Sequence, residues 1–227
     1  RNIRKNVLHI GPPGFMRDPD FGYHPPRELG SRGAATACRS AALGPSAVDR
    51  VVAVCKVYTS VPEDAANPSR IMRDRDADVL ERFRDADRRG QKDDAGAQTT
   101  SDGRSYGVLD LVALRHACAV NSADGIAITR LDTLAGLDTI RVCVAYENDG
   151  GSIVTVPESL AELEGYRAVT KSLDGWSESL GESRRYEELP GALHDFLGFV
   201  EDVTETPVEV ISASPENRIV RRKIWTG

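Results

Sequence analysis

The chain has 227 residues, of which 40% are hydrophobic and 28% are charged, and its formal net charge at pH 7 is −6. This length and composition predict one soluble globular domain with a substantial core. The acidic balance argues against sequence-independent nucleic-acid binding, which requires a basic surface. No apolar run approaches the roughly 20 residues that cross a bilayer, so we expect neither nucleic acid nor membrane as a partner.

The N-terminal residues and the cysteines bear on the cellular compartment. Residues 1–6 are basic, but the apolar stretch after them is too brief for a good signal peptide. Residue 1 is not Met, so we expect translation to begin further upstream. The sequence has four cysteines without paired spacing: Cys38, Cys55, Cys118 and Cys143. They predict reduced, buried thiols in a cytoplasmic protein, and neither disulfides nor a zinc site.

The first 60 residues predict two short elements and one buried strand. A strand is expected over Asn6 to Ile10 and a helical segment over Gly33 to Leu43, with Gly- and Pro-rich loops between them. Val51 to Tyr58 is apolar on both faces, as expected for a strand of a parallel sheet.

Residues 70–94 are dominated by charge. Four apolar residues form one narrow stripe at helical spacing: Met72, Val79, Leu80 and Phe83. Residues 90–103 predict a mobile loop. We interpret the charge run as a solvated surface and not as a binding patch.

From residue 105 onward, helices and strands alternate. The predicted helices cover 110–120, 132–136, 157–164 and 189–205, and the predicted strands cover 125–129, 140–146, 152–156 and 207–212. Asp110 favours the N-terminus of the first of these helices, and residues 148–151 form a hairpin-type turn. This alternation predicts an α/β fold with a mostly parallel central sheet and flanking helices.

The run from Gly125 to Asp132 is the most informative part of the chain. A short buried strand delivers Thr129-Arg130-Leu131-Asp132 at its carboxyl end, where α/β proteins usually bind ligands. A carboxylate there can accept hydrogen bonds from N1–H and the exocyclic amine of guanine, each contributing about 1.5–3 kcal/mol. Adenine cannot present this pair of donors, and the arginine can cover the ring face. The alternative is that Asp132 only caps a following helix.

Five runs, in this order and with this spacing, resemble the C-terminal half of the adenylosuccinate synthetase family. They are Gly107-Val-Leu-Asp110, Thr129-Arg-Leu-Asp132, Val142-Cys-Val-Ala-Tyr146, Gly175-Trp-Ser177 and Ile211-Ser-Ala-Ser-Pro215. The family carries Gly-Trp-Leu-Asp, Thr-Lys-Leu-Asp, Val-Cys-Val-Ala-Tyr, Pro-Gly-Trp-Ser and Ile-Ser-x-Gly-Pro in these places. The resemblance is specific over residues 105–216 and fainter over residues 18–56.

The resemblance implies an adenylosuccinate-synthetase-like fold of the P-loop type that lacks its N-terminal phosphate-loop portion. Three parts are then expected. Residues 1–60 would form a partial sheet and loop segment with a degenerate IMP side. Residues 61–104 would be a charged, flexible insertion that includes the substrate loop, and residues 105–227 would recognise guanine nucleotide.

The resemblance also implies a reaction, a C–N ligation in AMP biosynthesis. The family uses GTP to phosphorylate the 6-oxygen of IMP, and the amine of L-aspartate then displaces the phosphate to give adenylosuccinate. GTP and Mg²⁺ are therefore the implied cofactors. IMP, L-aspartate and guanine nucleotide are the implied ligands, and the implied assembly is a homodimer or a pairing with an intact synthetase.

The family's catalytic loop, Gly-Asp-Glu-Gly-Lys-Gly-Lys, does not occur in these 227 residues, nor does a related glycine-rich phosphate cradle. Such a cradle aligns Mg²⁺ and the γ-phosphate, on which phosphoryl transfer depends. We therefore assign no catalytic residue and no Mg²⁺ ligand. This chain by itself is expected to be inactive.

By resemblance, guanine recognition involves two groups of residues: Thr129, Arg130, Leu131 and Asp132, and then Ser212 and Ser214. The substrate loop supplies Thr99, Thr100 and Arg104, and Arg104 is expected to contact the nucleotide as well. Arg130 stands where the family has Lys, and Ser214 stands where it has Gly, which would crowd a backbone contact.

Other substitutions disfavour the anionic substrates. Asp102 replaces an arginine of the substrate loop and would repel an anionic ligand. On the IMP side, Pro13 replaces a glutamine and Glu28 replaces a phosphate-contacting threonine. Residues 61–68 do not retain the family's Arg-Val-Gly-x-Gly-Pro-Phe-Pro.

Three interpretations remain open from the sequence. The chain is the C-terminal portion of a ligase, or it is a non-catalytic guanine-nucleotide-binding or dimerisation module derived from that family. In the third interpretation, residues 11–32 and 61–104 are distorted by frame errors or pseudogene decay.

Overall fold

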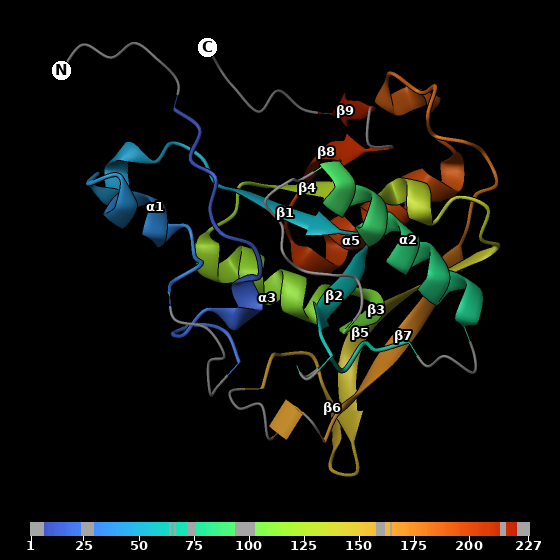
Figure 1. The fold of residues 1–227 in the computed structure, drawn as a ribbon, viewed down its shortest axis with the longest axis horizontal. Helices are drawn as coiled ribbons and strands as arrows, with labels where there is room; N and C mark the ends of the chain where they lie inside the picture. Colours follow the sequence, from blue (N-terminus) through green and yellow to red (C-terminus); the bar gives the residue numbers. More distant parts are fainter. Residues whose placement is uncertain are drawn as a thin grey trace.

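The computed structural model describes residues 7–23, 30–63, 65, 67–71, 76–93, 103–157, 162–163, 165–213 and 217–221. Its strands form two sheets, and helices lie against them (Figure 1). In this part of the chain, no helix is long and apolar enough to span a bilayer.

The first sheet has the order β1-β4-β8-β9. Its strands are β1 (Val52–Lys56), β4 (Gly125–Thr129), β8 (Val208–Ser212) and β9 (Arg218–Val220). The first three strands are parallel, and β9 pairs antiparallel with β8. The parallel arrangement expected for an α/β protein is therefore confirmed here.

The second sheet is mixed and mainly antiparallel. Its strands are β2 (Tyr58–Pro62), β3 (Arg104–Asp110), β5 (Thr139–Asn148), β6 (Gly151–Ile153) and β7 (Arg167–Asp174). Only β3 and β5 are parallel, whereas β2–β3, β5–β6 and β5–β7 are antiparallel. The predicted turn at 148–151 does join an antiparallel pair, because a tight hairpin can connect only strands of opposite direction.

Four α-helices have described boundaries: α1 (Ala35–Ser40), α2 (Ala77–Asp93), α3 (Leu111–Asn121) and α5 (Gly191–Thr204). Short 3₁₀ turns cover Phe15–Arg17 (η1), Pro45–Ala47 (η2), Leu131–Thr133 (η3) and Tyr186–Glu188 (η4). Helices α3 and α5 pack on each other and contact strands of both sheets, and α2 contacts β3 and η3. The two sheets thus share one core.

Helix spacing explains how α5 joins this core. Its buried side chains recur at intervals of three and four residues, on one face of the helix: Leu193, Phe196, Leu197 and Val200. They belong to the same buried cluster as Ile128 of β4 and Val142 of β5.

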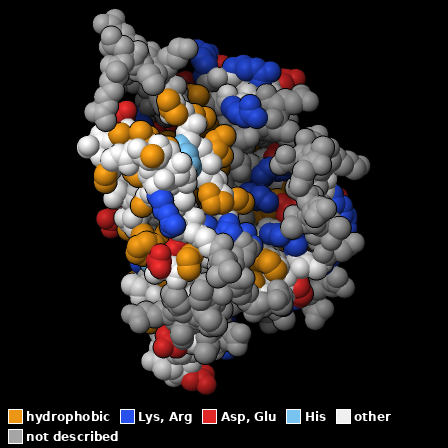
Figure 2. Space-filling view, turned by 60° about the vertical axis from the view of Figure 1, so that its left-hand side comes forward, with side chains coloured by type: hydrophobic (Ala, Val, Ile, Leu, Met, Phe, Trp, Pro, Cys, Tyr) orange, Lys and Arg blue, Asp and Glu red, His pale blue; other side chains and the backbone are white. Residues whose placement is uncertain are grey.

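Charge is not spread evenly over the surface. Although the chain is acidic overall, basic side chains gather in a band across the middle of the face shown in Figure 2, and hydrophobic side chains border them. Local potential on the molecule therefore differs from what the net charge suggests.

Three sequence-based expectations near the N-terminus are wrong. Residues 7–10 form no strand, and Val7 and Ile10 are exposed. Val51 to Tyr58 is not one strand, because the chain leaves the first sheet after Lys56 and enters the second at Tyr58. Nor is this run buried on both faces, since Val54 is 72% exposed on a strand at the edge of its sheet.

The charged segment contains more regular structure than expected. Leu80 and Phe83 are buried on α2, which confirms the predicted apolar stripe where it is described. The helix continues to Asp93, so the predicted loop does not begin at residue 90, and the rest of that loop, residues 94–102, lies outside the described residues. Most of the predicted helix over 157–164 lies outside them too, and η3 replaces the helix predicted over 132–136.

Candidate functional site

The carboxyl ends of three parallel strands meet at one edge of the first sheet. Lys56, the last residue of β1, is in register with Thr129, the last residue of β4. Ile128 is in register with Ile211, so Ser212 at the end of β8 continues the same row. The Thr129 hydroxyl donates a hydrogen bond to the carbonyl of Cys55 over 3.0 Å, which ties β4 to β1 at this edge. Ligands of α/β proteins usually bind at such an edge.

The turn after β4 presents Arg130 and Asp132. Arg130 has a left-handed backbone conformation (φ 69°, ψ 27°), which is uncommon for a residue other than glycine and is often found at functional sites. The hydroxyl and backbone N–H of Thr133 both donate to the carbonyl of Arg130, over 2.7 and 3.0 Å. Leu131 is fully buried and anchors the turn in the core. Within this turn, the buried Leu131 therefore lies in sequence between two polar residues, Arg130 and Asp132, whose side chains are partly exposed.

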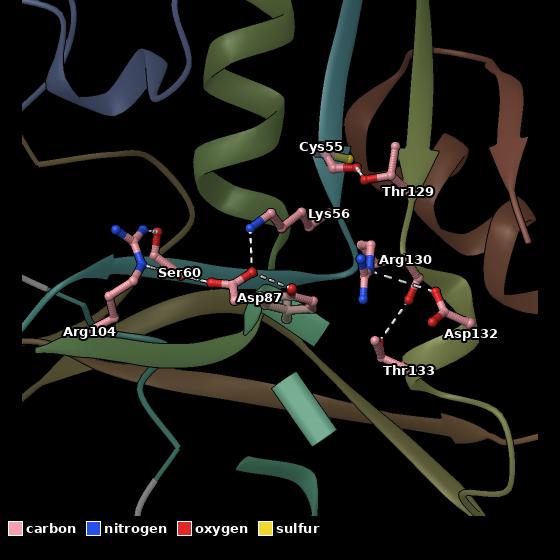
Figure 3. Close-up of polar contacts among 10 residues, drawn as sticks. Cys55, Lys56, Ser60, Asp87, Arg104, Thr129, Arg130, Asp132 and Thr133 are labelled. Atoms are coloured by element: carbon pink, nitrogen blue, oxygen red, sulfur yellow. Dashed lines mark hydrogen bonds and ion pairs between the residues drawn. The ribbon is translucent and has the colours of Figure 1, made fainter. Parts of the chain in front are cut away.

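Arg130 and Asp132 face each other without a hydrogen bond between them (Figure 3). Arg130 Nε lies 3.7 Å from Asp132 Oδ1, and Arg89 Nη2 lies 3.9 Å from Asp132 Oδ2. Among the described residues, Arg130 Nε and Nη2 and Asp132 Oδ1 are buried and have no hydrogen-bond partner. An unsatisfied buried polar group costs about 1–3 kcal/mol. Such an arrangement of two donors beside an acceptor indicates a place for a polar ligand.

The capping interpretation of Asp132 does not agree with the structure. The residue that precedes η3 is Arg130, and no side chain makes a capping hydrogen bond to this turn in the described chain. The Asp132 side chain is 23% exposed, so solvent reaches it. Its Oδ1 atom, by contrast, is itself buried.

A second polar cluster lies beside this pair and is centred on Asp87 of α2 (Figure 3). Asp87 Oδ1 accepts hydrogen bonds from Lys56 Nζ and from the Tyr58 hydroxyl, each over 2.6 Å. Asp87 Oδ2 accepts one from the Ser60 hydroxyl over 2.8 Å. Arg104 donates through Nε to the Ser60 hydroxyl over 2.7 Å and through Nη2 to the Ser60 carbonyl over 2.6 Å. This network joins β1, β2, β3 and α2.

The electrostatics keep Asp87 ionised. Burial alone would raise the pKa of its carboxyl group, but the Lys56 ammonium and the hydrogen bonds from Lys56, Tyr58 and Ser60 together hold that pKa below its ordinary value of 3.8. Burial, and then the hydrogen bond to Asp87, raise the pKa of the Tyr58 hydroxyl, so this group remains a donor. The guanidinium of Arg130 is close enough to Tyr58 to oppose that rise. The two polar clusters are therefore electrostatically connected.

A cavity in the described part of the molecule lies elsewhere. It has a volume of about 490 Å³ and lies between α3, the segment after β6 and the carboxyl end of α5. No residue predicted for guanine or substrate binding lines it. His116 on its wall has Nε2 2.8 Å from the carbonyl oxygen of Phe21, a contact that fastens the N-terminal segment to α3.

Comparison with known proteins identifies the family. The adenylosuccinate synthetase family matches residues 1–220. The chain belongs to the adenylosuccinate synthetase family. The adenylosuccinate synthetase of Clostridium novyi is 33% identical over 212 residues, which cover 93% of this chain and 47% of that protein. The adenylosuccinate synthetase of Prochlorococcus marinus is 36% identical over 209 residues, covering 92% and 46%.

The fold agrees with this membership. The structure of a fully ligated adenylosuccinate synthetase from Plasmodium falciparum superposes with a TM-score of 0.81 at 25% identity, covering 93% of this chain and 49% of that one. The sequence-based family and fold class are confirmed. The chain spans about half the length of the curated relatives it matches.

The structure describes only some of the site residues implied by the family resemblance. Arg130 and Asp132 lie together, and Thr129 and Ser212 end adjacent strands. Arg104, predicted for the substrate loop, lies in the Asp87 network, on the side of Asp87 opposite Arg130 and Asp132 (Figure 3). Five further residues named from the sequence lie outside the described residues: Thr99, Thr100, Asp102, Glu28 and Ser214.

Asp87 is the site residue that sequence reasoning missed, because it lies within a run assigned to a solvated surface. The signal was its spacing: it follows buried Phe83 by four residues and therefore shares its helix face. The assignment as solvated surface is wrong for Asp87, whose side chain is only 6% exposed, and correct for Asp85, which is 52% exposed.

The described residues do not suit a magnesium site. Within the described ranges no group of three or more His, Cys, Asp or Glu side chains could hold a metal ion. Asp87 is already saturated by three donors. No step involving Mg²⁺ is assigned to these residues.

Proposed function

We propose that this chain carries the guanine-nucleotide-recognition part of an adenylosuccinate synthetase, which ligates IMP and L-aspartate at the expense of GTP. One observation carries the proposal: the buried Oδ1 of Asp132 lies 3.7 Å from Arg130 Nε, and neither atom has a hydrogen-bond partner among the described residues. The Asp132 carboxylate accepts from N1–H and the 2-amino group of guanine. Arg130 covers the ring or donates to its O6 and N7 acceptors.

The neighbouring residues have supporting roles in this proposal. Thr129 and Leu131 hold the turn in place, one by its hydrogen bond to β1 and the other by burial. Ser212, with Ser214, borders the base. Arg104, with Thr99 and Thr100, binds the L-aspartate substrate.

The cellular role follows from the family. The protein is proposed to act in AMP biosynthesis in the cytoplasm, as a homodimer or paired with an intact synthetase. GTP is the nucleotide, and Mg²⁺ would be held by residues outside the set described above. The division of the chain into residues 1–60, 61–104 and 105–227 stays a prediction.

A second candidate is a non-catalytic guanine-nucleotide-binding or dimerisation module. Two carboxylates of the sequence favour it, because Asp102 and Glu28 stand where the family binds anionic substrates. Both candidates share the guanine site, so turnover and not guanine binding distinguishes them.

The guanine site is tested by thermal unfolding of the purified chain with GDP and with ADP. At about 100 times its dissociation constant, a ligand adds roughly 2.7 kcal/mol to the free energy of unfolding. We expect GDP to raise the midpoint and ADP to leave it unchanged. Asp132→Ala should abolish the GDP response. Asp132→Asn should weaken it and favour the xanthine nucleotide, because an amide donates to a 2-oxo group where a carboxylate accepts from a 2-amino group.

Asp138→Ala serves as the matched control. Asp138 is exposed and lies five residues after Thr133, and in the described structure its side chain makes no contact with Arg130 or Asp132. This variant should respond to GDP as the wild type does. An equal response to GDP and ADP in the wild type would refute the guanine site.

A further inference from the structure

Asp87 places a carboxylate of the chain itself among the basic groups of the site. Lys56 Nζ lies 2.6 Å from Oδ1, and Arg104 Nε lies 3.8 Å from Oδ2. The hydroxyl groups of Tyr58 and Ser60 complete its hydrogen bonding. Two cations and two hydroxyl donors around two oxygen atoms are the surroundings that a bound carboxylate or phosphate would have.

Stability alone does not account for this arrangement. Removing a carboxylate from water costs several kcal/mol, and a buried ion pair only partly recovers that cost. Asp87 lies on the face of α2 that also carries the buried residues Leu80 and Phe83. An apolar residue in its place would extend the stripe without any desolvation of charge.

The cluster is accessible to solvent from the basic side. The Lys56 side chain is 43% exposed and that of Arg104 is 20% exposed, whereas that of Asp87 is 6% exposed. An anion arriving from solvent therefore meets Lys56 and Arg104 first and competes with Asp87 for them. Arg130, whose Nε and Nη2 have no hydrogen-bond partner among the described residues, lies on the side of Asp87 opposite Arg104 (Figure 3).

We propose that Asp87 is a specificity-determining residue that occupies, with its own carboxylate, an oxyanion subsite formed by Lys56, Ser60 and Arg104. The ligand class excluded is a compound that would place a carboxylate or phosphate group against Lys56 and Ser60, where Asp87 already lies; the guanine nucleotide and the L-aspartate of the proposed function bind outside this position. This inference rests on the proposed function, because it places the subsite next to Arg130 and Asp132, the two residues proposed to bind guanine. While Asp87 is ionised, its negative charge repels a second anion at that position.

The test is chemical rescue of Asp87→Ala, which vacates the subsite and leaves Lys56 and Arg104 without their counter-ion. Thermal unfolding is followed while inorganic phosphate or L-aspartate is titrated without nucleotide, against sodium chloride at matched ionic strength. We expect half-maximal stabilisation of Asp87→Ala at a concentration at least about tenfold below that needed by the wild type. The two anions separate a phosphate subsite from a carboxylate subsite.

Asp85→Ala is the matched control, because it removes the same charge from the same helix at a position that is 52% exposed. It should respond to phosphate and L-aspartate as the wild type does. If neither phosphate nor L-aspartate stabilises Asp87→Ala beyond the chloride effect or beyond Asp85→Ala, the proposal is refuted. Should Asp87→Ala not fold in any buffer, Asp87→Asn replaces it with the same readout and the same criterion.

A second variant excludes a general stability effect. In Lys56→Met/Asp87→Leu an apolar side chain fills the Asp87 position, and of the two cations only Arg104 remains. This double variant should gain no affinity for phosphate or L-aspartate. A gain as large as that of Asp87→Ala would contradict the proposed subsite. Because this experiment uses no guanine nucleotide, its outcome is independent of the GDP experiment. Failure of the subsite and failure of the guanine site can therefore be told apart.

Discussion

Asp110 shows how a single side chain can hold two elements together. Its Oδ1 accepts a hydrogen bond from the N–H of Ala113 over 3.0 Å, which caps α3, and its Oδ2 accepts one from the Tyr146 hydroxyl over 2.7 Å. Burial raises the pKa of this carboxyl group, against the opposite effect of the two hydrogen bonds. The sequence predicted the cap, but the bond to β5 emerged only from the fold.

Asp110→Ala is expected to lower the free energy of unfolding by about 2–4 kcal/mol, since it removes an N-cap and the carboxylate acceptor of the buried Tyr146 hydroxyl. Because the folded pKa is raised, the contribution of Asp110 is fully present below the unfolded pKa and is lost as pH rises through the folded pKa. The cost should therefore be larger at about pH 4 than at about pH 8. Urea unfolding at both pH values measures it. Asp149→Ala in the exposed turn should stay within about 0.5 kcal/mol of wild type, and a comparable loss there would contradict the explanation.

At the scale of elements, the approach of β7 to the start of β5 depends on one glycine. The N–H of Gly175 donates to the carbonyl of Asp138 over 2.9 Å. A Cβ at Gly175 would lie 1.7 Å from the carbonyl oxygen of Leu137, so the backbones could not both remain in place. Neither strand end can give way without loss of the β5–β7 pairing, which runs from Thr139↔Asp174 to Glu147↔Arg167.

Gly175→Ala is therefore expected to destabilise the protein by at least about 1–3 kcal/mol, the usual cost of overpacking. Gly198→Ala, inside α5, provides the opposite case. Nothing lies within 4 Å of its added Cβ, so the substitution should stabilise by about 0.5–1 kcal/mol through helix propensity and loss of unfolded-state freedom. Thermal unfolding of both variants measures the two changes in stability. Equal effects of the two substitutions would show that the close contact at Leu137 does not matter.

The strands that the sequence did not predict have weak patterns for a physical reason. Most side chains of β7 are exposed or half-buried, so this strand lacks the alternation that marks a sheet with one buried face. Its conformation is imposed by pairing with β5. The buried strand β4 was predictable from its continuous run of small and β-branched apolar residues, and the helix face of α5 from apolar residues at helical spacing.

At the scale of the whole molecule, the chain spans about half the length of the curated synthetases it matches. The family's phosphate-loop motif does not occur in these 227 residues. In the proposed function, the described residues therefore bind and orient the ligands, and phosphoryl transfer would require groups beyond them.

The chain alone is expected to form no detectable adenylosuccinate from IMP, L-aspartate and GTP with Mg²⁺. The measurement is the absorbance change or the chromatographic detection of product, with an intact synthetase assayed in the same mixture as the positive control. Robust turnover by the chain would contradict this account of the phosphate loop. Added to an intact synthetase, the chain should pair with it if the dimerisation module is correct.

The sequence by itself determined the family and the α/β class, because these depend on local runs whose spacing survives in the chain. Guanine recognition by the turn after β4 stays a prediction. The sequence also identified Arg104, although not its partner. Only the tertiary structure decided that Asp87 leaves the solvated face of α2 and meets Lys56, Ser60 and Arg104. Those residues are separated by 17 to 31 positions from Asp87, and no local pattern records which distant charge will face which. Such a contact exists only once two sheets and a helix have packed around it.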